Sequence, residues 1–149
     1  METGMKFSEL KVGMVLSHPP VTVEKQDMLD FSRKYDPQWF HVDEARAEQG
    51  RWEGLIASGW MTCGIAMRMA VETVLSDSDS FGSPGLENLR WLAPVRPGDS
   101  IRLEATIDSK RISSTRSDLG ILRWTWRVYN QHDVQVLEVE AVNMFDLAD

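Results

Sequence analysis

The 149-residue chain has one cysteine, Cys63, and no group of Cys and His residues at metal-ligand spacing. A lone cysteine cannot form a disulfide within the chain, so we expect no disulfide, no metal site and, by default, a cytoplasmic location. The first residues contain no basic region followed by an apolar run, and the longest apolar stretch is broken by Thr62, Arg68 and Glu72. We therefore expect neither a signal peptide nor a membrane span.

Basic residues are also in deficit, with 16 Lys and Arg against 23 Asp and Glu and a net charge of −7. Binding to nucleic acid needs a clustered excess of Lys and Arg, so this composition argues against a DNA or RNA partner. Repeats and low-complexity tracts are absent too, and this length is typical of one domain. The sequence predicts a single domain over residues 1–149, with a polar loop at 76–80.

Helices are predicted mainly in the first half of the chain. The Pro19-Pro20 pair blocks a helix, so residues 12–23 are expected to form an edge strand, a turn or an extended arm. A helix is predicted over 23–34, with Thr22 as its cap and Pro37 ending it.

Residues 60–75 are apolar almost all round, which is typical of a helix buried on most faces. Arg68 and Glu72 lie four residues apart and should mark its narrow exposed side. We expect this segment to be the central helix of the domain.

The second half alternates between apolar and polar residues, which is the pattern of strands with one buried face. Four strands are predicted, at about residues 86–93, 101–107, 122–128 and 137–141. Helices followed by antiparallel strands indicate an α+β domain, in which a curved sheet buries the apolar helix against one face.

One candidate site is the segment Y-D-P-Q-W-F-H-V-D, residues 35–43, which places Asp36 and His41 five residues apart in a predicted loop. Both side chains can turn toward one cavity, where partial burial would shift their pKa values toward acid–base work. The residues alone also fit a structural reading, with Asp36 capping the next turn and His41 an ordinary loop histidine.

A second segment, G-L-I-A-S-G-W at residues 54–60, leads into the predicted central helix. At a helix N-terminus Gly59 would let a ligand approach the backbone, where free N–H groups favour an oxygen that gains negative charge. These residues fit equally well a structural reading, in which Gly59 only forms a tight turn and Ser58 caps the helix. Trp52 and Trp60 flank the segment, so one of them can line a pocket.

These two segments, together with L-R-W-L-A-P-V-R-P-G-D at residues 89–99, resemble the MaoC-like dehydratase and R-specific enoyl-CoA hydratase family over nearly the whole chain. The resemblance implies the hot-dog fold, an antiparallel sheet wrapped around one long helix. It also implies a hydratase or dehydratase acting on a 2-enoyl or 3-hydroxyacyl thioester. Asp36 and His41 would be the acid–base pair, and the backbone N–H of Gly59 would polarise the thioester carbonyl.

The resemblance further implies a substrate carried on coenzyme A or acyl carrier protein, no metal or redox cofactor, and a homodimer or larger homo-oligomer. The chain departs from the family pattern at Gln38 and Trp39, where Asn and Pro are usual, and at Ser58, where His is frequent. We expect Gln38, Trp39, Ser58 and Trp60 to contact substrate, with Trp39 narrowing the acyl pocket or covering its mouth.

Two rival functions fit the same resemblance. One is a hot-dog acyl-CoA thioesterase, which shares the fold and the carbonyl site at the helix end. The other is a non-catalytic module or subunit that binds acyl thioesters. The spacing of Asp36 and His41 favours hydration over thioester hydrolysis, and the presence of both residues argues against a silent subunit.

Overall fold

The computed structural model describes residues 4–147, in which six strands form one antiparallel sheet. The strands are β1 (Val15–Thr22), β2 (Ser80–Gly82), β3 (Leu86–Trp91), β4 (Ser100–Ile112), β5 (Leu119–Tyr129) and β6 (Gln135–Asp146). Their order is β1-β4-β5-β6-β2, and β3 also pairs with β6. The helical segments are η1 (Phe7–Glu9), α1 (Lys25–Tyr35), α2 (Trp39–Val42), α3 (Glu44–Glu48), α4 (Gly59–Ala70) and η2 (Val71–Leu75).

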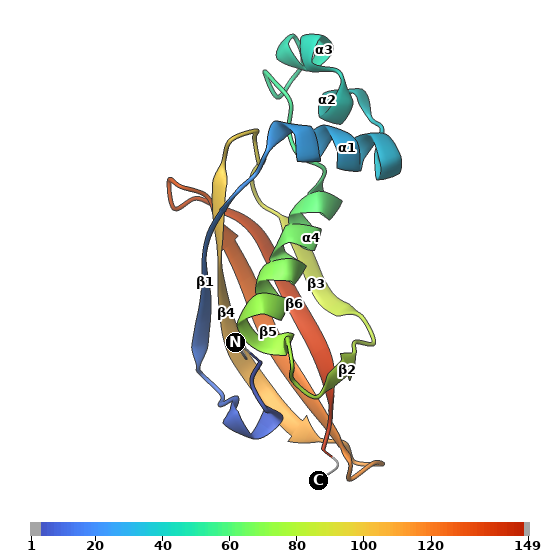
Figure 1. Ribbon diagram of the computed structural model, residues 1–149, viewed down its shortest axis with the longest axis vertical. Coiled ribbons are helices and arrows are strands. Elements are labelled where there is room, and N and C mark those ends of the chain that lie inside the picture. Colours follow the sequence, from blue (N-terminus) through green and yellow to red (C-terminus); the bar gives the residue numbers. More distant parts are fainter. Residues whose placement is uncertain (1–3, 148–149) are drawn as a thin grey trace.

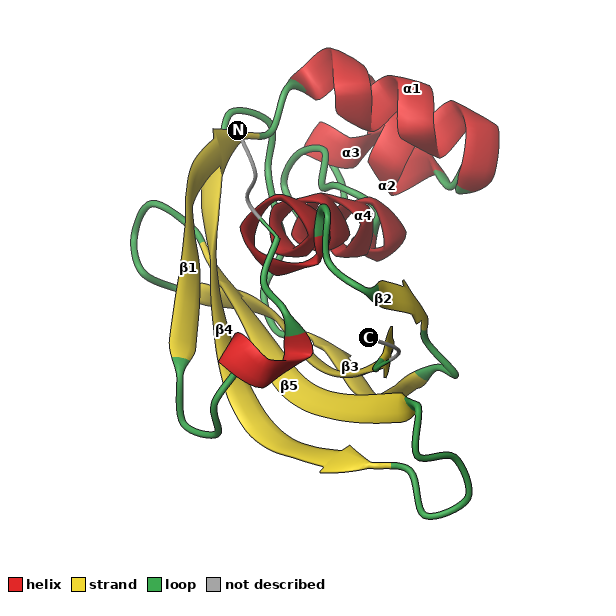
Figure 2. Cartoon of the chain, turned by 60° about the horizontal axis from the view of Figure 1, so that its bottom comes forward, coloured by secondary structure: helices red, strands yellow, loops and turns green. Residues whose placement is uncertain are grey.

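The sheet curves around α4, which lies along its inner face (Figures 1 and 2). Helices α1, α2 and α3 gather at the N-terminal end of α4 and form a cap there (Figure 1). This is the hot-dog arrangement, so the predicted α+β class is confirmed.

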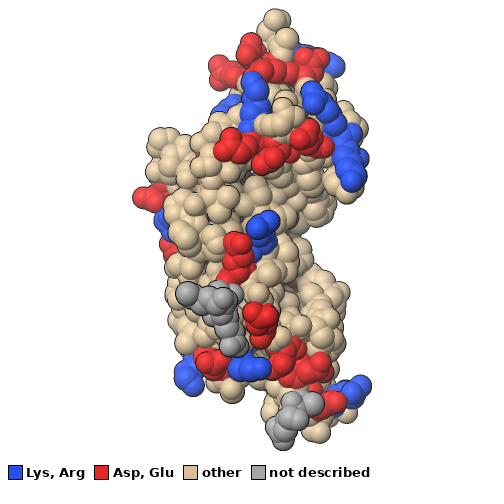
Figure 3. All heavy atoms as spheres, viewed as in Figure 1, with Lys and Arg blue, Asp and Glu red and all other residues tan. Residues whose placement is uncertain are grey.

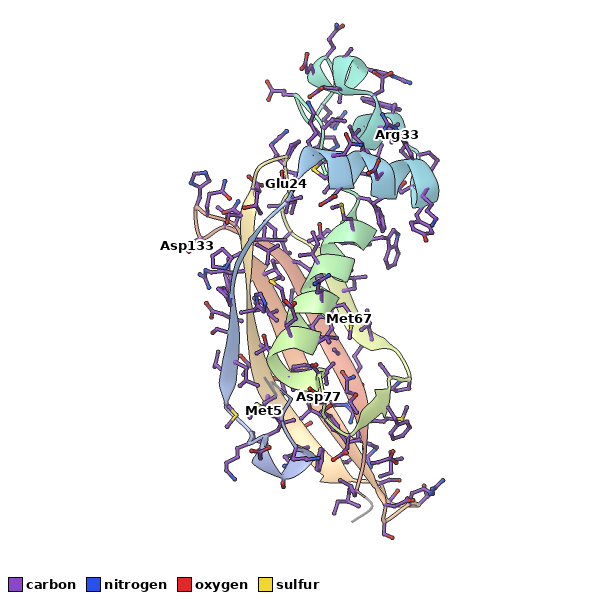
Figure 4. The ribbon with its side chains drawn as sticks, viewed as in Figure 1. Met5, Glu24, Arg33, Met67, Asp77 and Asp133 are labelled. Carbon is purple, nitrogen blue, oxygen red and sulfur yellow. The ribbon has the colours of Figure 1, made fainter. Side chains whose placement is uncertain are left out.

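Alternation along the strands builds the core between the sheet and α4. In β4 the inward residues Ile101, Leu103 and Ile107 are at most 1% exposed, and they belong to one buried cluster with Met69 of α4. Each such side chain contributes roughly 1.5–3 kcal/mol when it is fully buried. Met67, in contrast, is 40% exposed on the side of α4 that faces away from the sheet (Figure 4).

Two predicted helix boundaries differ from the structure. Thr22 does not cap α1, because it is the last residue of β1 and pairs with Ser100 of β4. The helix instead begins at Lys25 and ends at Tyr35, immediately before Asp36 and Pro37. The predicted central helix is divided, since α4 ends at Ala70 and the chain continues as a π-helical segment, η2.

Charged side chains on the face in Figure 3 gather on the cap and at the opposite end of the molecule. The middle of this face is largely uncharged (Figure 3). Within residues 4–147, none of the helices is both long enough and apolar enough to cross a membrane.

Candidate active site

A cavity of about 460 Å³ lies at the N-terminal end of α4. Its walls come from the α1–α2 connection, the segment from 52 to 62, the segment from 91 to 95, and β6. Most of the lining is apolar. The polar side chains that line it include Asp36, Gln38, His41 and Thr62.

The carboxylate of Asp36 is held by three side chains. Ser58 Oγ donates a hydrogen bond to Oδ2 at 2.7 Å, and Gln38 Nε2 donates to Oδ1 at 2.8 Å. His41 Nε2 lies 3.2 Å from the same Oδ2. Asp36 immediately follows α1, because Pro37 disfavours helical geometry in the residue before it. The structure thus brings together the carboxylate and the imidazole that the sequence placed five residues apart.

His41 is 4% exposed and lies in the short helix α2, where the sequence predicted a loop. Its Nδ1 lies 2.7 Å from the carbonyl oxygen of Ile56. A carbonyl oxygen only accepts hydrogen bonds, so Nδ1 carries a proton and donates it there. This bond fixes the ring with Nε2 toward Asp36, and Nε2 is the atom that can exchange a proton in the cavity.

Several groups act on the pKa of Asp36. Burial raises it, but the hydrogen bonds from Ser58 and Gln38 and the charge of His41 lower it, and the net result is a pKa below the ordinary value of 3.8. Hydrogen bonds to the ionised form therefore outweigh desolvation. Asp36 is a carboxylate at neutral pH and can accept a proton or a hydrogen bond.

Ser58→Ala is expected to raise the pKa of Asp36, because it removes one of the two hydrogen bonds that stabilise the carboxylate. The pKa of Asp36 is lower in the folded protein than in the unfolded chain, so the ionised Asp36 carboxylate stabilises the fold at pH values above the unfolded pKa. This stabilisation is lost as the pH falls through the pKa of Asp36 in the folded protein. A ¹³C NMR titration of the Asp36 carboxyl measures the shift, and Ser58→Thr, which keeps the hydroxyl, is the control. An unchanged titration midpoint in Ser58→Ala would contradict this account.

Gly59 is the first residue of α4 and lines the cavity. No acceptor among the described residues takes a hydrogen bond from its N–H. The next N–H, of Trp60, is bound by Ser58 Oγ at 3.3 Å. Ser58 therefore caps the helix as well as bonding Asp36. The free N–H of Gly59, at the positive end of the helix dipole, is available to an oxygen in the cavity.

Trp91 is a cavity residue that sequence reasoning missed. A Cβ atom built on Gly59 would lie 2.3 Å from Trp91 Cε2 and 2.4 Å from Nε1. The ring also meets Trp60 edge to face, with centroids 5.2 Å apart. Residue 59 must therefore be glycine because of space, since the indole lies directly against its α-carbon.

Two residues expected to contact substrate do not line the cavity. Trp39 packs on Gly50, and the guanidinium of Arg46 lies 4.5 Å from the centroid of its ring. Successive helical residues point about 100° apart, so in α2 a residue two before the inward His41 points away from the cavity. Trp39 does not line this cavity, and its contact with substrate stays a prediction. Ser58 is fully buried and contacts Asp36 instead.

Three further residues singled out from the sequence line the cavity, whereas Cys63 does not. Trp52 and Trp60 both line the cavity, and Gln38 lines it as well. Burial raises the pKa of the Cys63 thiol, an effect that the Trp91 side chain partly offsets. A thiol with a raised pKa is a poor nucleophile at neutral pH, which agrees with a packing role for Cys63.

The chain is similar in sequence to proteins of a known family. A family model described as a MaoC-like domain matches residues 8–121. The uncharacterized protein YdeM of Bacillus subtilis (strain 168) is 33% identical over 136 residues, which cover 91% of this chain and 95% of YdeM.

Solved structures show the same fold. A MaoC-like dehydratase from Rhodospirillum rubrum superposes with a TM-score of 0.90 at 31% identity, covering 98% of this chain and 99% of that one. The R-hydratase PhaJ1 from Pseudomonas aeruginosa gives a TM-score of 0.79 at 23% identity, covering 95% and 85%. The chain therefore belongs to the MaoC-like dehydratase family.

Proposed function

We propose that the protein is a hydratase or dehydratase, which adds water to a 2-enoyl thioester or removes it from a 3-hydroxyacyl thioester, with coenzyme A as carrier. The observation that carries this proposal is the convergence of three groups on one cavity. They are the carboxylate of Asp36, the imidazole of His41 and the free N–H of Gly59.

The acid–base step is assigned to Asp36 and His41. In the hydration direction the water oxygen forms a bond to C3, and one water proton passes to the Asp36–His41 pair. The pair then returns a proton to C2, so that the enzyme ends as it began. A positioned acid–base pair typically accelerates such a step roughly 100- to 10,000-fold. The lowered pKa of Asp36 keeps its carboxylate ionised and ready to hold the water.

The carbonyl step is assigned to Gly59. Attack at C3 moves negative charge onto the thioester oxygen, and a preorganised N–H stabilises that charge by roughly 3–4 kcal/mol in comparable sites. The reaction is redox-neutral, so the proposal includes no metal or redox cofactor. Coenzyme A enters only as part of the substrate.

Crotonyl-CoA tests the proposal. Purified protein is expected to remove the enoyl-thioester absorbance without releasing free thiol, with both measured in the same tube. Release of thiol would instead indicate the thioesterase. If enoyl thioesters of several chain lengths, on coenzyme A and on acyl carrier protein, all stayed unchanged, the non-catalytic binding module would be favoured.

We also propose a homodimer. Within the described residues β3 pairs with β6 and with no other strand, which leaves one edge open. Leu86 and Trp91, in this strand, are 50% and 47% exposed. An open apolar edge is suited to isologous pairing with a second copy. Light scattering should then give twice the chain mass of 17.0 kDa.

A further inference from the structure

Thr62 is a buried polar residue in the wall of the cavity. It lies in α4, one turn after Ser58, and is only 2% exposed. It lines the same cavity as Asp36, His41 and Gly59. The acid–base chemistry assigned above makes no use of it.

Within the described residues the hydroxyl of Thr62 takes part in no side-chain hydrogen bond. The fully enclosed side-chain atoms without a partner there are Ser32 Oγ and Trp126 Nε1, so the Thr62 hydroxyl is not sealed off and reaches the cavity that Thr62 lines. A helical threonine usually bonds back to the carbonyl four residues earlier, here that of Ser58. That oxygen already accepts from the N–H of Met61 at 3.0 Å and from the N–H of Thr62 itself at 3.2 Å. A carbonyl oxygen has two lone pairs, so both are in use and the hydroxyl is left for the cavity.

Thr62 and Gly59 lie one turn apart on the same face of α4. Residues three apart on a helix are neighbours, and helical side chains lean toward the N-terminus. The side chain of Thr62 therefore covers the turn that begins at Gly59. Both groups line one cavity.

Two other polar side chains of the cavity are already engaged. Gln38 and His41 both contact the carboxylate of Asp36, and His41 also bonds the backbone. The N–H of Gly59 and the hydroxyl of Thr62 are thus hydrogen-bond donors left for a ligand.

We propose that the Thr62 hydroxyl is a second donor to the thioester carbonyl, beside the N–H of Gly59. Together they form a two-donor oxyanion hole, and Thr62 is a catalytic residue. The inference rests on the proposed function for the identity of the substrate. Because the hydroxyl donates to an oxygen that gains charge, its effect is larger on the transition state than on the bound substrate.

Thr62→Val tests this with a side chain of nearly the same shape. The variant is expected to lose about 100-fold in kcat for crotonyl-CoA, with little change in KM. Thr62→Ser, which keeps the hydroxyl, should stay close to the parent. Thr73→Val, in η2 and outside the cavity, is the matched control.

A spectroscopic measurement separates this inference from the proposed function. Butyryl-CoA labelled with ¹³C at the carbonyl persists on a hydratase, because it has neither a double bond to hydrate nor a 3-hydroxyl to eliminate. It is bound to the protein, and its carbonyl stretch is recorded by infrared difference spectroscopy. Thr62→Val should move the stretch to higher frequency. If the carbonyl stretch shifts in this way although the protein hydrates no enoyl thioester, Thr62 is a donor to the carbonyl and the hydratase proposal fails. An unchanged stretch, or full activity in Thr62→Val, would overturn the role of Thr62.

Discussion

Asp36→Asn is expected to reduce crotonyl-CoA hydration at least about 100-fold at neutral pH while leaving the fold intact. The amide has the same shape as the carboxylate but cannot take up a proton from water. It also cannot accept hydrogen bonds on both sides, although Ser58 and Gln38 donate to the two oxygens of the native carboxylate. One of these donors would face an NH₂ group. Initial rates and circular dichroism, measured together, separate lost chemistry from lost structure.

His41→Ala should cause a loss of the same order, because it removes the imidazole beside Asp36 to which the proposed function assigns proton exchange. His41→Asn guards against a folding defect, since its amide can still donate to the Ile56 carbonyl now bonded by Nδ1. Asp30→Asn is the matched control, because Asp30 is an exposed residue of α1 that bonds only Gln26 among the described residues. Near-normal rates in folded Asp36 and His41 variants would remove the acid–base assignment.

Sequence alone predicted the parts of the fold that depend on local pattern. Alternation identified β4, β5 and β6, and the all-round apolar character of residues 60–75 identified the central helix. The strands extend beyond the predicted ends, because pairing adds residues that the pattern does not mark. Ile112 at the end of β4, for example, pairs with Gly120 of β5.

Side-chain direction in the site was harder to predict. Pro37 ends α1, so the proximity of Asp36 and His41 follows from a short span of chain. The direction of Trp39 depends instead on the single helical turn α2, for which the sequence has no periodic signal. An aromatic residue next to a predicted site was assigned to the cavity, but its ring faces Gly50.

Residues far apart in the sequence were missed for a different reason. Trp91 reaches Gly59 because β3 pairs with β6 in a register that sets Trp91 opposite Leu137. Such a register depends on the whole sheet and is not encoded in any one segment. Thr62 was hidden inside an apolar run, where a lone hydroxyl looks like a minor interruption. Its importance emerges only from the cavity and from the carbonyl bonds around Ser58.

Gly59→Ala is expected to be as damaging as loss of the acid–base pair, although it adds only a methyl group. That methyl would lie 2.3 Å from Trp91 Cε2, so the indole or the start of α4 must move. Overpacking of this kind costs about 1–3 kcal/mol in stability. Displacing a catalytic group by about 1 Å can cost roughly 100-fold in rate. Hydration of crotonyl-CoA and urea unfolding measure the two effects.

The helix itself supplies the control for this prediction. Gly64 lies in the same helix, but a Cβ there meets no atom within 4 Å, so Gly64→Ala should be neutral or stabilise the protein by up to about 1 kcal/mol. Adding Trp91→Ala to Gly59→Ala removes the steric conflict, so the double variant should be more stable than the sum of the single changes predicts. Strict additivity would mean that the indole of Trp91 does not rest on Gly59, and full activity in Gly59→Ala would mean that the added methyl group does not displace the N–H that faces the cavity.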